Sequence, residues 1–293
     1  MTETTGSETR SGEIFLGQNN YGKSEIRLVK VKRDTERHEL WDLDVRVTFE
    51  GDFDAAHIEG DNSLLLATDT MRNTVYALAK DHLTGSIEGF GLALVDHFLE
   101  VGPTVTGVRV EITQFVWDRI EVDGRPHEHS FIRGRGERRA TVSGEAGGER
   151  SVEAGIGDVY VIKTTNSGFE GFLHERFTTL PETNDRILAT IVTARWIYNT
   201  TDANFDRLWN DVLQRTLETF TDHYSPSVQN TLYRMGKAVL EEFPEVERLW
   251  YSFPNVHHIP YDLARFGIDN EGEIFHATQD PYGQIEGWVE RRS

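Results

Sequence analysis

The sequence predicts an α+β fold built from two units that share one order of elements: strand, strand, helix, helix, strand, strand. Three observations lead to this prediction. Strand-like alternation occurs in neighbouring pairs, helical periodicity occurs in pairs between them, and the whole order occurs twice along the 293 residues. Strands that are neighbours in sequence, with helices grouped between them, favour antiparallel sheets with helices on one face.

The first unit is expected over residues 13–145. Its clearest strand runs from Leu40 to Phe49, where apolar residues occupy every second position and polar residues the positions between. The loosely alternating segment 24–32 and the short connection 34–38 complete a hairpin. The expected elements are strands at 24–32 and 40–49, helices at 70–81 and 86–101, with Ser86 as an N-cap, and strands at 108–112 and 138–142, joined by a Gly- and Arg-rich connection.

The second unit is expected over residues 146–293 and repeats this order. Its second helix is opened by Ser225-Pro-Ser227, a typical helix start. Residues 1–12 are polar, lack the apolar core of a secretory signal and are expected to form a disordered tail. The expected elements are strands at 157–164 and 189–198, helices at 205–220 and 228–243, and strands at 246–253 and 283–289.

An open antiparallel sheet has two edges with unpaired backbone groups. Such edges invite association, and closing the strands of several subunits into a barrel would satisfy them. The sequence therefore predicts a homo-oligomer whose sheets close into a barrel on assembly.

Composition excludes several kinds of site. The chain has no cysteine, which removes disulfides, thiolate nucleophiles and Cys-based metal sites and is consistent with the cytoplasm. No apolar run approaches the roughly 20 residues of a membrane-spanning helix. A net charge of −19 argues against a general nucleic-acid binder. An anionic substrate would require a local positive patch.

One segment combines small, flexible and aromatic residues directly after an alternating strand. Thr164-Thr-Asn-Ser-Gly-Phe-Glu-Gly-Phe172 places glycines within three positions on both sides of Phe169, so that backbone could approach a ligand closely. Read from Lys163 to Arg186, this region resembles the signature of the urate oxidases. Four further segments match that family in order: Asn20-Tyr-Gly-Lys23, Ala67-Thr-Asp-Thr70, Ser225-Pro-Ser-Val-Gln229 and Pro254-Asn-Val-His257.

The resemblance covers nearly the whole chain after the tail and implies a tandem tunnelling fold. It also implies a tunnel-shaped homotetramer with active sites across subunit interfaces. The implied reaction is oxidation of urate by molecular oxygen to 5-hydroxyisourate and hydrogen peroxide, with neither metal nor organic cofactor. The chain ends Glu-Arg-Arg-Ser293, without the peroxisomal Ser-Lys-Leu of many eukaryotic relatives, which fits a cytoplasmic, bacterial setting.

The resemblance assigns the substrate-binding residues. Phe169 offers a face on which a flat purine can stack, an interaction of roughly 1 to 3 kcal/mol. The planar guanidinium of Arg186 suits the carbonyl edge of an anion better than a lysine would. The remaining implied contacts are the Val228 backbone and Gln229 on the opposite edge, Asn255 and Thr68 holding oxygen or water above the purine, and the Asp69 backbone amide rather than its carboxylate.

A proton relay of Lys23, Thr68 and His257 is implied for catalysis. Urate must lose protons before it gives electrons to oxygen, and a lysine serves as base only where its pKa is lowered. Thr68 can pass a proton along a hydrogen-bonded chain, and His257 can share one near neutral pH.

The same residues also have other interpretations, some of them purely structural. Without the family, Phe169 would be core, Arg186 would be an exposed ion pair with Asp185, and His257 would be structural. His57, His127-Glu-His129 and His257-His258 could instead supply a zinc site, as in relatives of the same fold that act on pterins or nucleotides. A purine-binding protein without turnover is a second alternative. The run Arg133–Arg139 is expected to be a solvated hairpin rather than an RNA site.

Overall fold

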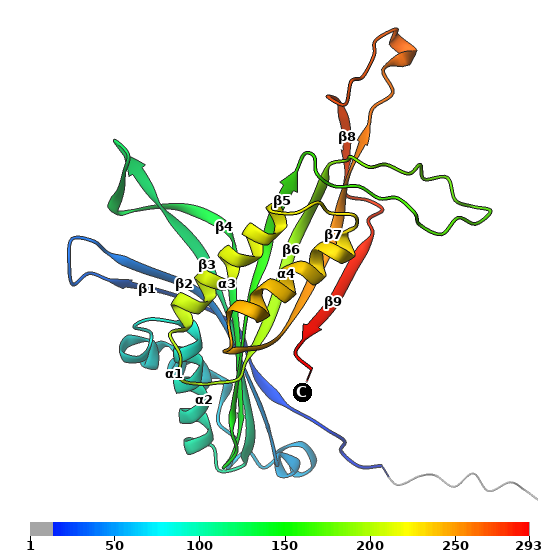
Figure 1. Cartoon of the computed structure of the whole chain (residues 1–293). Coiled ribbons are helices and arrows are strands. Elements are labelled where there is room, and N and C mark those ends of the chain that lie inside the picture. Colours follow the sequence, from blue (N-terminus) through cyan, green and yellow to red (C-terminus); the bar gives the residue numbers. More distant parts are fainter. Residues whose placement is uncertain (1–13, 293) are drawn as a thin grey trace, which may run out of the picture.

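A computed structural model of the chain describes residues 14–292, so the tail expected at 1–12 lies outside the described residues. The fold is one nine-stranded, wholly antiparallel sheet with the order β1-β2-β3-β4-β5-β6-β7, where β7 pairs on its far side with β9 and, further along, with β8 (Figure 1). The bounds of the main elements are β1 Tyr21–Lys32, β2 Glu39–Gly51, α1 Thr68–His82, α2 Ile87–Val101, β3 Val105–Val122, β4 Arg125–Glu145, β5 Arg150–Lys163, β6 Leu188–Tyr198, α3 Phe205–Thr221, α4 Val228–Glu242, β7 Val246–Pro260, β8 Phe275–Thr278 and β9 Gln284–Glu290. Short helical turns occur at Ala55–Glu59 and Ala264–Phe266.

The helices cover one face of the sheet because the strands are apolar on that face only. In β2, Leu43, Val45, Val47 and Phe49 are fully buried while Arg46 between them is exposed. The face without helices carries alternating arginine and glutamate side chains, such as Arg46 with Glu111. An antiparallel sheet with one wet face gives this pattern, and the expected fold class is confirmed.

The two units repeat in detail as well as in order. Lys30 on β1 donates to three carbonyls at the end of α1, those of Ala79, Lys80 and Leu83. Lys163 on β5 does the same at the end of α3, donating to the carbonyls of Phe220 and His223. A lysine on the first strand thus binds the carboxyl end of the first helix in each unit, where the helix dipole favours a cation. The boundary at 145/146 stays a prediction, although it falls in the turn between β4 and β5.

A buried ionic group joins the two units. Arg138 on β4 donates to Glu88 of α2 and to Asp206 of α3, each at 2.6 Å. The Arg138 side chain is 8% exposed and that of Glu88 is fully buried. The guanidinium also lies over the ring of Trp209, 5.3 Å from its centroid. Because α2 belongs to the first unit and α3 to the second, Arg138 fixes both helix pairs onto one sheet.

The strands expected at 108–112 and 138–142 are much longer than predicted, and the Gly- and Arg-rich connection between them is itself strand, with the run 133–139 in a hairpin as expected. β3 and β4 continue as a long hairpin that projects from the sheet (Figure 1) and turns at Asp123 and Gly124, both with positive φ. This Asp-Gly pair suits a tight hairpin turn. His127 and His129 accordingly lie on β4 rather than in a loop.

One strand was missed. The four-residue β8 follows an arm that leaves β7 and returns to it, and a segment so short gives no clear periodicity. Eight strands were expected and nine are present in the described part of the chain.

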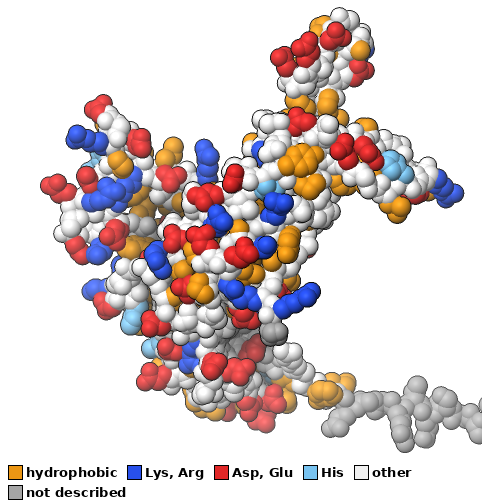
Figure 2. Space-filling view, viewed as in Figure 1, with side chains coloured by type: hydrophobic (Ala, Val, Ile, Leu, Met, Phe, Trp, Pro, Cys, Tyr) orange, Lys and Arg blue, Asp and Glu red, His pale blue; other side chains and the backbone are white. Residues whose placement is uncertain are grey.

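No helix within residues 14–292 is long and apolar enough to span a membrane. Figure 2 shows acidic side chains spread over one face with basic ones between them.

Replacing Arg138 by alanine should lower the free energy of unfolding by about 3–5 kcal/mol, because Glu88 would remain buried without its partner. The control is Lys237→Ala, which removes an exposed pair with Glu241 on α4 and should cost less than about 1 kcal/mol. Both are measured by urea unfolding at one protein concentration. Equal small losses would show that the triad does not hold the units together.

Candidate active site

The residues singled out from the sequence fall into two groups at opposite edges of the sheet. Phe169, Arg186, Val228, Gln229, Asn255 and His257 belong to the second unit, and Lys23, Thr68 and Asp69 to the first.

The loop that carries Phe169 is held by backbone hydrogen bonds to two other segments. Gly168 N donates to Ser225 O at 2.9 Å, and Phe169 N and O pair with Thr183 at 2.7 and 3.1 Å. Arg186 N donates to Ser167 O at 2.7 Å. These bonds bring the start of α4 and the Arg186 segment to the same place as Phe169.

Gly168 is required by close packing at this junction. A Cβ atom there would lie 2.1 Å from the Tyr224 hydroxyl and 2.9 Å from the Thr183 carbonyl oxygen. The Tyr224 hydroxyl also donates to Asn184 O at 3.1 Å, so it cannot move without losing that bond. The glycine before Phe169 therefore has a packing role.

A hydrogen-bonded network of uncharged side chains holds Ser225, whose carbonyl oxygen accepts from Gly168 of this loop. His223 Nδ1 lies 2.6 Å from Thr219 O, and its Nε2 lies 3.2 Å from the Ser225 hydroxyl. Thr231 in turn donates to Ser225 at 2.8 Å. Burial lowers the pKa of His223, which favours the neutral imidazole that can accept from Ser225. Ser225, fully buried, is thus fixed on several sides.

Arg186 is half-buried and does not pair with Asp185. That carboxylate instead accepts from the Thr165 hydroxyl and the Asn166 amide. The Arg186 guanidinium carbon lies 5.3 Å from the centroid of Phe169, and its buried Nε has no hydrogen-bond partner within residues 14–292. Burial lowers the pKa of Arg186, yet the group remains a cation at neutral pH. A desolvated cation with a free donor beside an aromatic ring suits a flat anion.

β7 supplies the other wall. Asn255 and His257 lie with Phe169 and Arg186 around one cavity of about 620 Å³. The position of Asn255 is fixed by its pairing with Thr190 on β6 and by the hydrogen bond that its backbone N–H donates to Gly283 O at 2.9 Å. This cavity is large enough for a bicyclic ligand and holds four of the expected residues.

Val228 and Gln229 begin α4. The Ser227 side chain caps this helix by accepting from Asn230 N at 3.1 Å. The amides of Val228 and Gln229 belong to the first turn, which has no intrahelical acceptors. Val228 is buried and the Gln229 side chain is exposed, so the residue can offer its amide group to a ligand.

The first-unit group is arranged by Tyr21. Its hydroxyl donates to Leu66 O at 3.2 Å, and its ring packs on Phe49 and Phe53. This bond links the start of β1, two residues before Lys23, to the segment entering α1. A bulge in the pairing follows Lys23 directly, and bulges redirect neighbouring side chains.

Thr68 and Asp69 form the first turn of α1, which has no side-chain cap because Ala67 occupies the N-cap position. The amides of this turn are therefore available to an acceptor. The Asp69 carboxylate is held by its own helix, 2.7 Å from Arg72 and 3.0 Å from Asn73.

The two groups do not meet within one chain, because the cavity around Phe169 and His257 is lined by second-unit residues. β1 and β7 are separated by six strand-to-strand steps of about 4.8 Å, or about 29 Å along the sheet. A site containing both Lys23 and His257 thus requires two copies of the chain.

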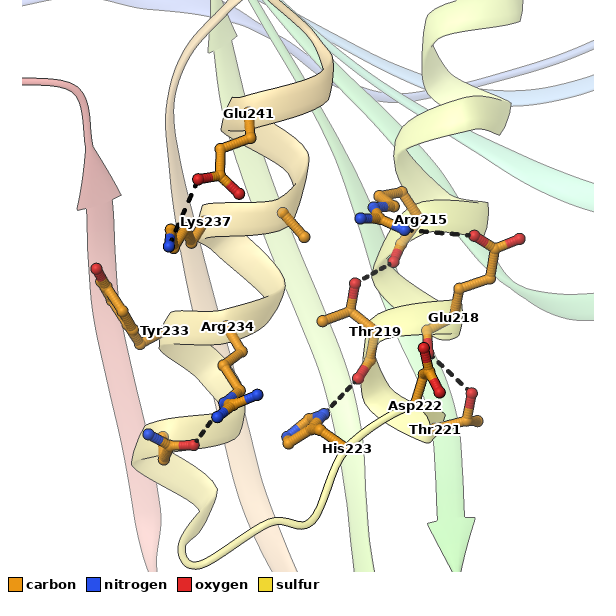
Figure 3. A pocket seen from close by; sticks show the side chains of 12 residues that line it. Arg215, Glu218, Thr219, Thr221, Asp222, His223, Tyr233, Arg234, Lys237 and Glu241 are labelled. Carbon is orange, nitrogen blue, oxygen red and sulfur yellow. Dashed lines mark hydrogen bonds and ion pairs between the residues drawn. The ribbon is translucent and has the colours of Figure 1, made fainter.

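A second hollow, between α3 and α4, is drawn in Figure 3 and lies outside this site. Its charged side chains largely neutralise one another. Arg215 pairs with Glu218 and Glu242, and Lys237 pairs with Glu241. The histidines considered for zinc are dispersed over β4, β7 and the turn at His57. No three His, Asp or Glu side chains of the described chain gather so as to hold a metal ion.

Comparison with known proteins decides the family. The uricase family model matches residues 19–143 and 152–286. The uricase of Arthrobacter globiformis is 47% identical over 292 residues, covering 99% of this chain and 94% of the relative. The chain belongs to the uricase family. Uricase from Dictyostelium discoideum is 39% identical, with 94% of this chain and 97% of the relative covered.

The fold of this chain also matches solved uricase structures. The crystal structure of the Arthrobacter globiformis uricase superposes with a TM-score of 0.90 at 46% identity, over 96% of each chain. A uricase from Bacillus fastidious, at 23% identity and TM-score 0.79 over 93% of each chain, has the same fold. The expected family and the tandem tunnelling fold are both confirmed.

Sequence reasoning missed the residues that support this candidate site. Tyr21 lies inside one recognised motif and His223 and Tyr224 directly precede another, but only their contacts show what they hold. The one signal available was that Tyr21 and Ser225 stand inside the quoted segments.

Replacing Gly168 by alanine should lower the free energy of unfolding by about 1–3 kcal/mol, the usual cost of overpacking. Adding Tyr224→Phe removes the hydroxyl at 2.1 Å and should recover part of that loss, whereas Tyr224→Phe alone should be mildly destabilising. The four proteins of this cycle are compared by chemical denaturation. Strict additivity of the two losses would contradict the proposed contact.

Proposed function

We propose that the chain oxidises urate with molecular oxygen and water to 5-hydroxyisourate and hydrogen peroxide, at sites that two copies of the chain build together. Two electrons and two protons pass from urate to oxygen, and the hydroxyl added to the purine comes from water. Membership in the uricase family over nearly the whole length supports the reaction. The separation of Lys23 from His257 by the width of the sheet supports a shared site.

The second-unit group would bind urate. The purine would stack on Phe169, with Arg186 donating to one edge and the Val228 amide and Gln229 to the other. The free Nε of Arg186 supports this placement, because a buried unpaired donor is costly until a ligand accepts from it. Asn255, together with Thr68, would hold oxygen or water above the ring, which is a task of orientation.

The first-unit group would complete the site from another copy. Lys23, Thr68 and His257 would form the proton relay, with the lysine and threonine from one chain and the histidine from the other. The Asp69 amide, at the uncapped start of α1, would donate to the anion, since its carboxylate is already bound to Arg72 and Asn73. Assembly would also place the Lys23 ammonium against the second copy, away from bulk water.

A homotetramer would provide these interfaces. Within residues 14–292, β1 pairs only with β2 and β9 only with β7, so the sheet has two open edges. Pairing these edges between copies would close a barrel, with the helices outside and the charged face lining a tunnel. Oxidation of urate without a metal or organic cofactor, and location in the cytoplasm, remain our expectations for this chain.

Turnover in the presence of a chelator separates this proposal from its rivals. A zinc enzyme of the same fold would lose activity when the metal is removed, and a passive purine binder would consume no oxygen. We expect undiminished loss of urate absorbance together with uptake of dissolved oxygen.

Lys23→Met should lower turnover by about 10² to 10⁴ while urate binding stays largely intact, because a positioned acid-base group contributes in that range. The measurement pairs steady-state kinetics with urate binding under anaerobic conditions. Lys30→Met is the matched control on the same strand, since the Lys30 ammonium binds carbonyls at the end of α1 and lies over the Trp41 ring, and there stability rather than turnover should fall. Unchanged turnover in Lys23→Met would exclude the relay.

Mixing two inactive variants tests whether the site is shared. Lys23→Met and Arg186→Met subunits, reassembled in equal amounts, should regain about one quarter of the wild-type activity, because about a quarter of the shared sites combine both intact residues. The control mixes Lys23→Met with Thr68→Ala. Those residues lie in the same half of one chain, so no interface becomes complete. Recovery in the control, or none in the test despite verified exchange, would contradict the shared site.

A further inference from the structure

The loop after Phe169 places two more rings in line with it. The rings of Phe169 and Phe172 are 4.8 Å apart and inclined by only 12°. The ring of His174 continues the row, 4.8 Å from Phe172 and inclined by 15°. Near-parallel rings at this spacing form offset stacks, one of the two favoured geometries of aromatic pairs.

The ring of His174, at the far end of the row, makes one polar side-chain contact. His174 Nε2 lies 3.1 Å from a carboxylate oxygen of Glu182. Glu182 directly precedes Thr183, whose backbone pairs with Phe169 in both directions. The stack therefore begins and ends on two chain segments that are joined at one end by the backbone bonds of Phe169 with Thr183 and at the other by the exposed His174–Glu182 contact.

This row covers one face of Phe169, and the same ring lines the cavity together with Arg186, whose guanidinium carbon lies over it at 5.3 Å from the centroid. The covered face meets Phe172, while Phe169 itself lines the cavity beside Arg186, Asn255 and His257. A phenyl ring on a loop can otherwise turn about its last side-chain bond. A parallel neighbour at 4.8 Å opposes that turn, because the rotated ring would lose the stack.

We propose that Phe172, backed by His174, is a positioning residue that fixes the plane of Phe169 for stacking of the purine. This inference rests on the proposed function, since it takes urate to be the ring that stacks on Phe169. Phe172 itself touches no substrate. It acts by keeping Phe169 parallel to the position that the purine occupies, which lowers the ordering cost of binding.

Phe172→Leu tests the inference by removing the ring while keeping an apolar side chain. Its KM for urate, and its Kd for the flat purine xanthine as a non-oxidised probe, should rise about three- to tenfold, the range for an aromatic pair, while kcat changes less than about twofold. Phe172→Tyr, which keeps the ring, should retain wild-type values. Phe177→Leu is the matched control, because Phe177 lies in the same loop, is 72% exposed and stands outside the row.

The second ring is tested in the same way. His174→Phe keeps a ring and loses the contact with Glu182, whereas His174→Asn loses the ring. If stacking carries the effect, only the asparagine variant should raise the KM. This pair keeps the proposal falsifiable should Phe172→Leu fail to fold, and size measurement of each variant confirms assembly.

Separate outcomes identify what has failed. Wild-type protein that neither binds nor oxidises urate would overturn the proposed function itself. Weakened binding in Phe169→Leu but not in Phe172→Leu would overturn the positioning role alone. Equal losses in Phe172→Leu and Phe172→Tyr would also overturn it, because the ring would then be irrelevant.

Discussion

The open sheet is the constraint on which the rest of this structure depends. The nine antiparallel strands of residues 14–292 leave β1 at one edge and β9 at the other, and the two units are joined through β4 and β5 in the middle of the sheet. The buried Arg138 triad keeps both helix pairs on the same face. Each group of site residues is consequently positioned by one unit, and the two groups lie a sheet's width apart.

Local pattern was enough to predict most of the fold. The strict alternation around Val45 and the Ser86 N-cap, which accepts from Gly89, correspond to elements with nearly the expected bounds. The pattern was insufficient where strands leave the core. Along the projecting hairpin both faces meet solvent, so residues such as His127 and His129 show no alternation of burial to read.

The site could be predicted only in part, for a related reason. Five short segments identify the residues through resemblance, but no spacing along the chain says that Phe169 and Arg186 share a cavity while Lys23 lies elsewhere. That information resides in long-range backbone pairing, such as Gly168 with Ser225. The supporting residues Tyr21 and His223 carry no chemical signature, because their function is to hold backbone in place.

The distance between Lys23 and His257 has a consequence for the cell that makes this chain. Each newly synthesised polypeptide carries both groups of the proposed catalytic residues but no complete site. A free subunit, or a fragment released by degradation, would thus generate no peroxide, and oxidant production would be confined to the finished assembly.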